Sequence, residues 1–192
     1  MRNTTTDIEG TAAHLAGIRE RAEMLHSPAA VKQAVQRMAQ VVTTELGGKD
    51  PLLLCVMNGA VIPTAMLMLH LDFPLRLDYA HATRYRGETR GGDLHWRQHP
   101  LQSLQQQDVL IIDDIFDEGT TLAMIADYCR EQGARSVRSA VLVEKLRQRS
   151  TSYRPDFVGL QVEDRYVFGA GMDYKEYLRN LPAIYAVAEE DL

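Results

Sequence analysis

Three carboxylates and a glycine-containing loop follow one apolar segment, and their spacing is suited to binding a phosphorylated sugar. Four apolar residues, Val109 to Ile112, lead directly into Asp113 and Asp114, and Asp117 follows three residues later. Adjacent carboxylates can accept hydrogen bonds from a sugar diol, directly or through a divalent cation, and the third carboxylate could act as a base. An ordinary helix cap does not explain all three, because carboxylates crowded beside a buried strand repel one another.

The residues after these acids have the composition of a phosphate-binding loop. Glu118 and Gly119 precede two hydroxyl residues, Thr120 and Thr121, where a helical pattern begins. Glycine lets backbone N–H groups converge on an anion, and the first turn of the helix adds further unpaired N–H groups. The segment therefore predicts a sugar-phosphate site.

These groups need a sheet whose strands end at a common edge. Apolar runs predict strands at 51–57, 75–82, 94–97, 109–114, 137–143 and 157–162. Helical spacing predicts helices at 7–25, 28–47, 60–69 and 120–132. Strands that alternate with helices indicate an α/β fold with a mostly parallel sheet, and such sheets bind ligands at the carboxyl ends of their strands.

Composition and charge narrow the class of protein. The chain has 192 residues, 45% of them hydrophobic and 24% charged, which is typical of one globular domain. Its formal net charge of −5 argues against general nucleic-acid binding, and no apolar run reaches transmembrane length. Cys55 and Cys129 lie in apolar segments and predict buried free thiols in a cytoplasmic protein, with a single disulfide as the alternative. The lack of a long apolar run predicts no membrane partner.

Two further places could contribute to the same site. Residues 57–60 form a second strand-to-helix loop, which could face the first across a crevice. Lys145 follows the predicted strand 137–143 and could donate to a ligand carbonyl or phosphate, although a solvated lysine at a strand end is the commoner case. We expect Arg147 and Arg149 to be solvated.

The segment 164–174 is rich in aromatic residues, glycine and acid. An aromatic residue such as Tyr166 could stack on a flat ring, and Asp173 could hold a metal through water. A hairpin with core aromatics explains the same pattern equally well, so the spacing alone leaves both interpretations open.

In combination, these segments resemble the hypoxanthine-guanine phosphoribosyltransferases, which are type I phosphoribosyltransferases, over roughly residues 10–188. The matches are the 5-phosphoribosyl-1-pyrophosphate (PRPP) motif at 109–121, a pyrophosphate loop at 57–60, Lys145 at its spacing before 153–159, and a C-terminal signature within 167–181. The resemblance implies a single phosphoribosyltransferase domain over 1–192. Its mostly parallel, helix-flanked core would span about 28–160, and residues 1–27 and 161–192 would form a small hood.

The resemblance also implies residue roles. Asp117 would be the general base at purine N7. The PRPP and phosphate ligands would be Asp113, Asp114, Glu118, Gly119, Thr120, Thr121, Asn58, Gly59, Arg179 and Tyr85, the last in a loop that closes over the site. The purine would contact Lys145, Tyr166, Val167, Met172 and Asp173. Mg²⁺ would be held by Asp173, Asp113 and Asp114.

The implied activity is Mg²⁺-dependent purine salvage. Phosphoribosyl would pass from PRPP to N9 of hypoxanthine or guanine, giving IMP or GMP and pyrophosphate, in a homodimer or homotetramer. A xanthine-preferring enzyme is an alternative, whereas Lys145 and the segment 167–174 argue against adenine. A PRPP-sensing regulator on the same fold is a second alternative, but it would need a basic face or an added domain to bind nucleic acid.

Three positions depart from the family pattern. Asp113 stands where this family more often has Glu, Glu118 where Ser or Thr is common, and Asn58 where a basic residue is common. A carboxylate at 118 should point outward, leaving only its backbone N–H for the phosphate. The cis peptide typical of the family would fall between Met57 and Asn58.

Overall fold

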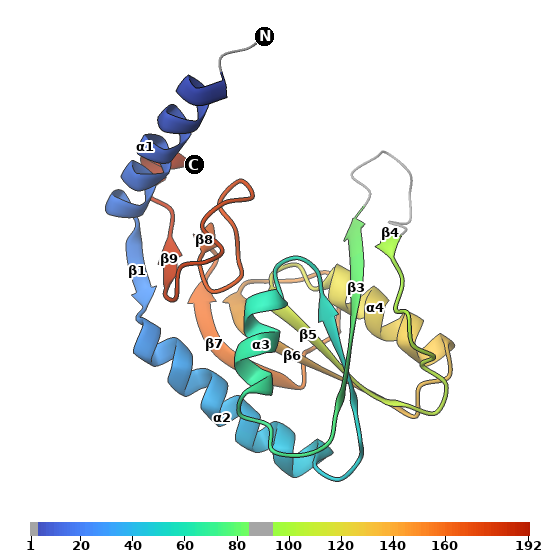
Figure 1. The fold of residues 1–192 in the computed structure, drawn as a ribbon. Coiled ribbons are helices and arrows are strands. Elements are labelled where there is room, and N and C mark those ends of the chain that lie inside the picture. The colour runs from blue at the N-terminus through green and yellow to red at the C-terminus, as the bar shows by residue number, and fades with distance from the viewer. Residues whose placement is uncertain (1–3, 85–93) are drawn as a thin grey trace.

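The computed structural model describes residues 4–84 and 94–192, which form two sheets and their flanking helices (Figure 1). Within this part of the chain the larger sheet has six strands in the order β4-β3-β2-β5-β6-β7. Their bounds are β2 (Leu52–Val56), β3 (Arg76–Arg84), β4 (Leu94–Gln98), β5 (Asp108–Phe116), β6 (Ser136–Leu146) and β7 (Phe157–Glu163). All neighbours pair in parallel except β3 and β4, which confirms the predicted mostly parallel sheet.

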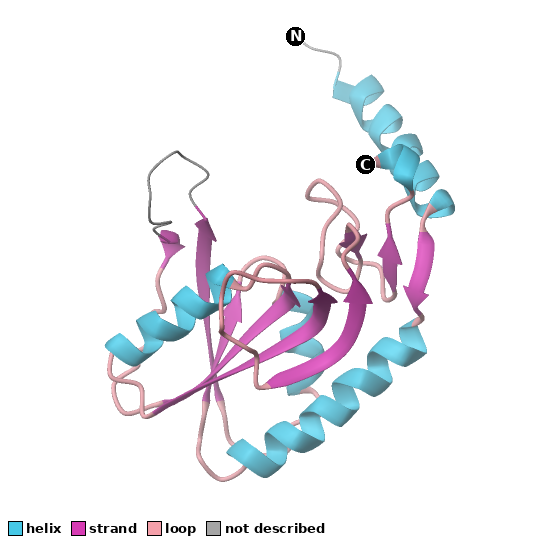
Figure 2. Cartoon of the chain, turned by 180° about the vertical axis from the view of Figure 1, so that it is seen from behind, coloured by secondary structure: helices cyan, strands magenta, loops and turns pink. Residues whose placement is uncertain are grey.

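Helices cover both faces of this sheet. Helix α3 (Val61–Met68) lies on one face and α4 (Thr120–Glu131) on the other, as the two opposite views show (Figures 1 and 2). Helix α2 (Pro28–Leu46) packs against α3 and β7. It begins as predicted at Ser27, whose hydroxyl accepts a hydrogen bond from the Ala30 N–H at 3.3 Å.

The smaller sheet joins the two ends of the chain. Strands β1 (Glu23–His26), β9 (Ile184–Ala186) and β8 (Val167–Phe168) pair antiparallel in the order β1-β9-β8. Helix α1 (Thr4–Arg21) precedes β1 and extends away from the larger sheet, and a 3₁₀ turn (Glu189–Asp191) follows β9 (Figure 1). Ile18, Phe168, Tyr174 and Tyr185 belong to a separate small core here.

The helix predicted over 7–25 is wrong at its carboxyl end. Glu23 pairs with Ala186 and Met24 with Tyr185, so these residues are strand. Pairing with a segment more than 150 residues away overrides the local helical spacing. The remaining predicted helices and strands are present, with ends that differ by a few residues.

Two predictions from composition can be compared directly with the structure. Cys55 and Cys129 are both buried and free, as expected. None of the described helices is both long and apolar enough to span a membrane.

The first residue of β5 is anchored to the neighbouring strand. Asp108 is buried and accepts hydrogen bonds from Arg135 and from the Ser136 hydroxyl, the latter at 2.6 Å. The hydrogen bond from Arg135 lowers the pKa of Asp108 below its usual range, although burial opposes this effect. These contacts fix the strand whose opposite end carries the acidic residues.

We expect Asp108→Asn to lower the free energy of unfolding by about 1 kcal/mol near pH 7. A carboxyl with a depressed folded-state pKa stabilises the fold above the unfolded value of about 3.9, and this contribution disappears as the pH falls through the folded-state pKa. Urea unfolding measured at pH 7 and at pH 3 should therefore show a smaller difference in the free energy of unfolding between Asp108→Asn and wild type at pH 3. Asp72→Asn, at an exposed position, is the control. An Asp108→Asn difference of equal size at both pH values would contradict the assignment.

Candidate active site

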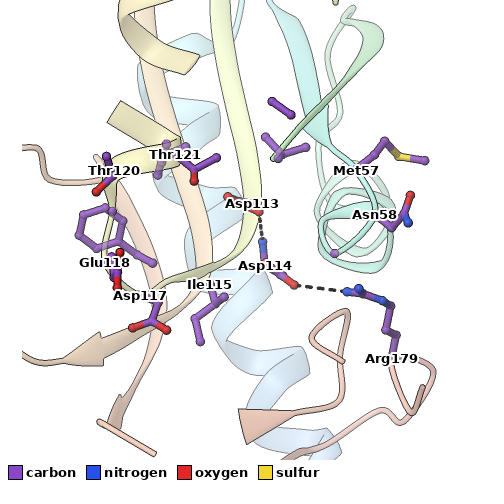
Figure 3. Close-up of a pocket in the computed structure, with 16 residues that line it drawn as sticks. Met57, Asn58, Asp113, Asp114, Ile115, Asp117, Glu118, Thr120, Thr121 and Arg179 are labelled. Atoms are coloured by element: carbon purple, nitrogen blue, oxygen red, sulfur yellow. Dashed lines mark hydrogen bonds and ion pairs between the residues drawn. The ribbon is translucent and has the colours of Figure 1, made fainter. Parts of the chain in front are cut away.

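The predicted phosphate loop and the second loop line one cavity at the carboxyl ends of β2 and β5, which are neighbouring strands (Figure 3). The cavity has a volume of about 360 Å³. Its lining includes the predicted PRPP and phosphate ligands Asn58, Gly59, Asp113, Asp114, Glu118, Gly119, Thr120, Thr121 and Arg179, together with Asp117. Burial along β5 is complete from Asp108 to Ile112 and becomes partial where the acids begin.

The two adjacent acids, Asp113 and Asp114, are partly buried and influence each other's charge. The backbone N–H of Asp114 donates to the Asp113 carboxylate at 2.9 Å, and Arg179 Nη1 lies 3.9 Å from Asp114 Oδ2 (Figure 3). Burial and the neighbouring charge of Asp114 raise the pKa of Asp113 well above its usual range. Burial also raises the pKa of Asp114, opposed by Asp113 and by the charge of Arg179. The pair is thus suited to bind positive charge or hydroxyl donors.

Glycine is required where the two loops approach their neighbours. A Cβ atom at Gly59 would overlap the carboxylate of Asp114. Gly119 has a φ of +80°, and a Cβ atom there would overlap the ring of Phe116. The peptide bond between Met57 and Asn58 is cis, which confirms the expectation from the family resemblance.

Asp117 is held by two cations. Its carboxylate accepts from Lys145 Nζ at 2.9 Å and from Arg147 Nη1 at 2.7 Å. Burial raises the pKa of Asp117, but these two hydrogen bonds and charges outweigh it, so the net pKa lies below the usual range. Asp117 is therefore a carboxylate at neutral pH, and Asp164 lies near the same cations, 3.8 Å from Lys145 Nζ.

Two sequence interpretations of the basic segment need correction. Lys145 is buried within β6 rather than solvated past the end of its strand, because β6 continues to Leu146. Arg149 is also not solvated: its side chain is only 4% exposed and its guanidinium lies 4.5 Å from the centre of the Phe116 ring. Arg147 is 31% exposed at its side chain and contacts Asp117, a contact with no signal in the sequence.

Arg179, in the C-terminal signature, contacts two acidic residues, one of which lines the cavity. Its Nη2 atom lies 2.7 Å from Asp173 Oδ1, and its Nη1 atom donates to the carbonyl of Gly171 at 2.8 Å. One guanidinium thus connects Asp173 with Asp114. Within the described part of the chain, His, Cys, Asp and Glu side chains form no group of three or more that could hold a metal by themselves.

The remaining predicted purine ligands lie near this segment but do not line the cavity. Val167 and Met172 are buried, and Val167 pairs with Ala186 in the small sheet. Tyr166 is 37% exposed, and its hydroxyl accepts from the Lys175 N–H at 3.1 Å. The other open interpretation, core aromatics, holds for Phe168 and Tyr174, both buried. Glu118 is exposed, and Tyr85 lies outside the described residues.

A second hollow beside α3 is larger, about 810 Å³, but lacks comparable chemistry. Its lining includes Asp78, whose carboxylate accepts from the N–H groups of Tyr79, Leu101 and Gln102 at 2.7 to 2.8 Å. That carboxylate has a structural role, so the cavity at the acids is the better candidate site.

Comparison with known proteins agrees with this geometry. The family model of the phosphoribosyl transferase domain matches residues 21–176. The chain belongs to the phosphoribosyltransferase family. This result confirms the resemblance inferred from the motifs and makes the protein a phosphoribosyltransferase enzyme, which disfavours the PRPP-sensing regulator.

Named relatives of this phosphoribosyltransferase cover most of the chain. The hypoxanthine-guanine phosphoribosyltransferase of Bacillus subtilis is 32% identical over 163 residues, 84% of this chain and 91% of the relative. That of Streptococcus thermophilus is 32% identical over 169 residues, 88% of this chain and 94% of the relative. A crystal structure of a Staphylococcus aureus hypoxanthine phosphoribosyltransferase has a TM-score of 0.85 at 26% identity, covering 90% of this chain and 95% of that one.

We expect Gly119→Ala to lower the free energy of unfolding by about 1–3 kcal/mol, because the added methyl group meets the Phe116 ring at a positive φ. Gly10→Ala is a matched control in α1, where a Cβ atom would meet nothing within 4 Å. That change should leave stability unchanged or raise it by up to about 1 kcal/mol. Equal urea midpoints for the two variants would contradict the packing described for the loop.

Proposed function

We propose that this phosphoribosyltransferase carries out purine salvage by transferring phosphoribosyl from PRPP to N9 of hypoxanthine or guanine, giving IMP or GMP and pyrophosphate. The observation that carries this proposal is the pairing of Lys145 Nζ with Asp117 Oδ2 at 2.9 Å, beside the PRPP motif. A donor and an acceptor this close match two neighbouring groups on one edge of a purine.

The edge of a 6-oxopurine offers the complementary pair. Its 6-oxo oxygen is an acceptor, which a lysine ammonium can bind, and the N–H at N7 is a donor, which a carboxylate can bind. Adenine presents an amino donor at position 6, so Lys145 would face a second donor there and find no acceptor on the base. The pair therefore favours hypoxanthine and guanine over adenine. Tyr166, Val167 and Met172 would complete the base site, as the family resemblance implies.

The PRPP side follows from the same cavity. Asp113 and Asp114 would accept hydrogen bonds from the ribose hydroxyls, and the N–H groups of residues 118–121 would hold the 5′-phosphate at the start of α4. Asn58 and Gly59 would face the pyrophosphate, with Arg179 supplying positive charge. Tyr85 remains a predicted part of the closing loop.

The donor set fits Mg²⁺. Asp113, Asp114 and Asp173 supply only carboxylate oxygens, two of which already contact Arg179, so substrate oxygens and water would complete the coordination. Mg²⁺ prefers oxygen ligands and is usually held by one or two carboxylates together with substrate oxygens and water. When bound, it would offset charge on the leaving pyrophosphate.

The transfer involves one bond broken, one bond formed and one proton moved, and residues of the chain would assist these changes. The bond between C1 of the ribose and pyrophosphate breaks, the bond from N9 to C1 forms, and the proton on N7 passes to Asp117. Arg147 and Lys145 keep Asp117 ionised before this step, because both lower its pKa. Lys145 would turn from Asp117 to the 6-oxo oxygen when the purine binds.

A xanthine-preferring enzyme remains the second candidate. Xanthine carries the same 6-oxo and N7 groups, so the Lys145–Asp117 pair does not discriminate against it. A structure of a hypoxanthine-guanine-xanthine phosphoribosyltransferase has a TM-score of 0.80 and 26% identity with this chain. The arrangement as one domain with a core at 28–160 and a hood, assembly into a homodimer or homotetramer, and a cytoplasmic location also remain predictions.

We predict that Asp117→Asn lowers the turnover of hypoxanthine by about 10²- to 10⁴-fold, the range of general-base contributions, while PRPP still binds. Initial rates and calorimetric titration with PRPP and Mg²⁺ separate the two effects. Asp127→Asn is the matched control, since its carboxylate is exposed and pairs with Arg130 within α4. Unchanged turnover in Asp117→Asn would exclude the proposed base.

We predict that Lys145→Met lowers kcat/KM for hypoxanthine by about 10- to 100-fold, the value of a lost hydrogen bond from a charged donor. The preference for hypoxanthine over adenine should fall by a similar factor, because adenine never used that donor. Lys32→Met, at an exposed position of α2, serves as the control. An undiminished preference for hypoxanthine in Lys145→Met would show that another group reads position 6.

A further inference from the structure

Arg149 binds the backbone of both residues that the proposed function assigns to the purine edge. Its Nε atom donates to the carbonyl of Asp117 at 2.6 Å, and its Nη2 atom donates to the carbonyl of Lys145. The same Nη2 atom donates to the carbonyl of Phe116 at 3.1 Å. One planar guanidinium therefore spans the ends of β5 and β6.

The position of these contacts in the sheet explains why a bridge is needed. The pairing of β5 with β6 ends at Phe116 and Glu144. Asp117 and Lys145 each lie one residue beyond this last pair, where the two strands no longer hold each other. The side chain of Arg149 connects the two strands at this point, because it donates to the carbonyl of Asp117 after β5 and to the carbonyl of Lys145 in β6.

Arg149 is itself fixed in place. Its side chain is only 4% exposed, and its guanidinium stacks on Phe116 at 4.5 Å from the ring centre. Its Nη1 atom lies 3.3 Å from Glu144 Oε1, while Glu144 Oε2 accepts from Gln161 on β7 at 3.0 Å. The charge of the buried arginine is thus balanced, and the fork of donors is anchored to three strands.

We propose that Arg149 is a positioning residue that sets the distance between Asp117 and Lys145, and so matches this pair to the purine edge. The inference rests on the proposed function, because that pair is its target. Arg149 itself would not contact the substrate. It acts through the backbone carbonyls of the two residues that do.

Lysine at this position should not suffice. An ammonium is a point charge on a flexible stem and lacks the planar fork that reaches several oxygens at once. We expect Arg149→Lys to lower kcat/KM for hypoxanthine by about 10- to 100-fold, since a misplacement near 1 Å can cost about 10²-fold. The Kd for PRPP should change by less than about threefold, because Arg149 bonds to the carbonyls of Phe116 and Asp117 and not to the N–H groups of residues 118–121 that would hold the 5′-phosphate. Arg154→Lys is the control, as Arg154 is exposed in the same segment.

A double-mutant cycle distinguishes positioning from a general loss of structure. In the Lys145→Met background, Arg149→Lys should reduce kcat/KM far less than in wild type, since one of the two positioned groups is already gone. Melting temperatures of the same four proteins should change additively. Fully additive effects on kcat/KM, or wild-type kinetics of Arg149→Lys, would overturn the inference.

Glu144→Gln provides a second variant if Arg149→Lys does not fold. It keeps a side chain that can bond to Gln161 but removes the negative charge beside Arg149. We expect a loss of about 3- to 10-fold in kcat/KM for hypoxanthine with unchanged PRPP binding, and unchanged kinetics would again overturn the inference. Absence of hypoxanthine turnover in the wild-type enzyme would instead refute the proposed function, so the two failures are distinguishable.

Discussion

The constraint on which the site depends is the partial burial of two adjacent carboxylates, Asp113 and Asp114, near the end of β5. The surrounding residues must compensate their negative charge. Two neighbouring, partly buried carboxylates repel each other, and burial raises the pKa of both. A chain selected only for stability would place apolar residues here. Asp114 is partly compensated by Arg179, 3.9 Å away, and Asp113 accepts from the backbone N–H of Asp114. In the proposed function the same two acids would bind the ribose hydroxyls and Mg²⁺.

The compensating charges come from distant parts of the sequence. Arg179, in the C-terminal segment, lies between Asp114 and Asp173, whereas Lys145 and Arg147, at the end of β6, hold Asp117. The segment between β8 and β9 is therefore linked to β5 by charge, through Arg179 and Asp114. Each acid then has its own environment: Asp113 and Asp114 have raised pKa values, and Asp117 has a lowered one.

Features with a local physical cause could be predicted from the sequence. The apolar run before Asp113 predicts a buried strand, and the acids and Gly119 after it predict the ligand-binding edge, because each depends on neighbours in the chain. The helix start at Ser27 is local in the same way. The cis peptide at Met57 followed from family resemblance rather than from the residues themselves.

Features that depend on distant contacts could not be predicted. Strand β1 continues a helical spacing pattern and is strand only because it pairs with β9. Strand β8 has two residues, too few to show alternation. Arg149 lies in a polar segment, and nothing in the sequence distinguishes an arginine that stacks on Phe116 from a solvated one.

In the proposed function the Lys145–Asp117 pair binds the 6-oxo and N7 groups of a purine beside bound PRPP. This recognition can be measured as initial rates of pyrophosphate release with hypoxanthine, guanine, xanthine and adenine, each with PRPP and Mg²⁺. We expect turnover of hypoxanthine and guanine, with adenine slower by at least about 100-fold. Adenine turnover equal to that of hypoxanthine, or no turnover of any 6-oxopurine, would contradict it.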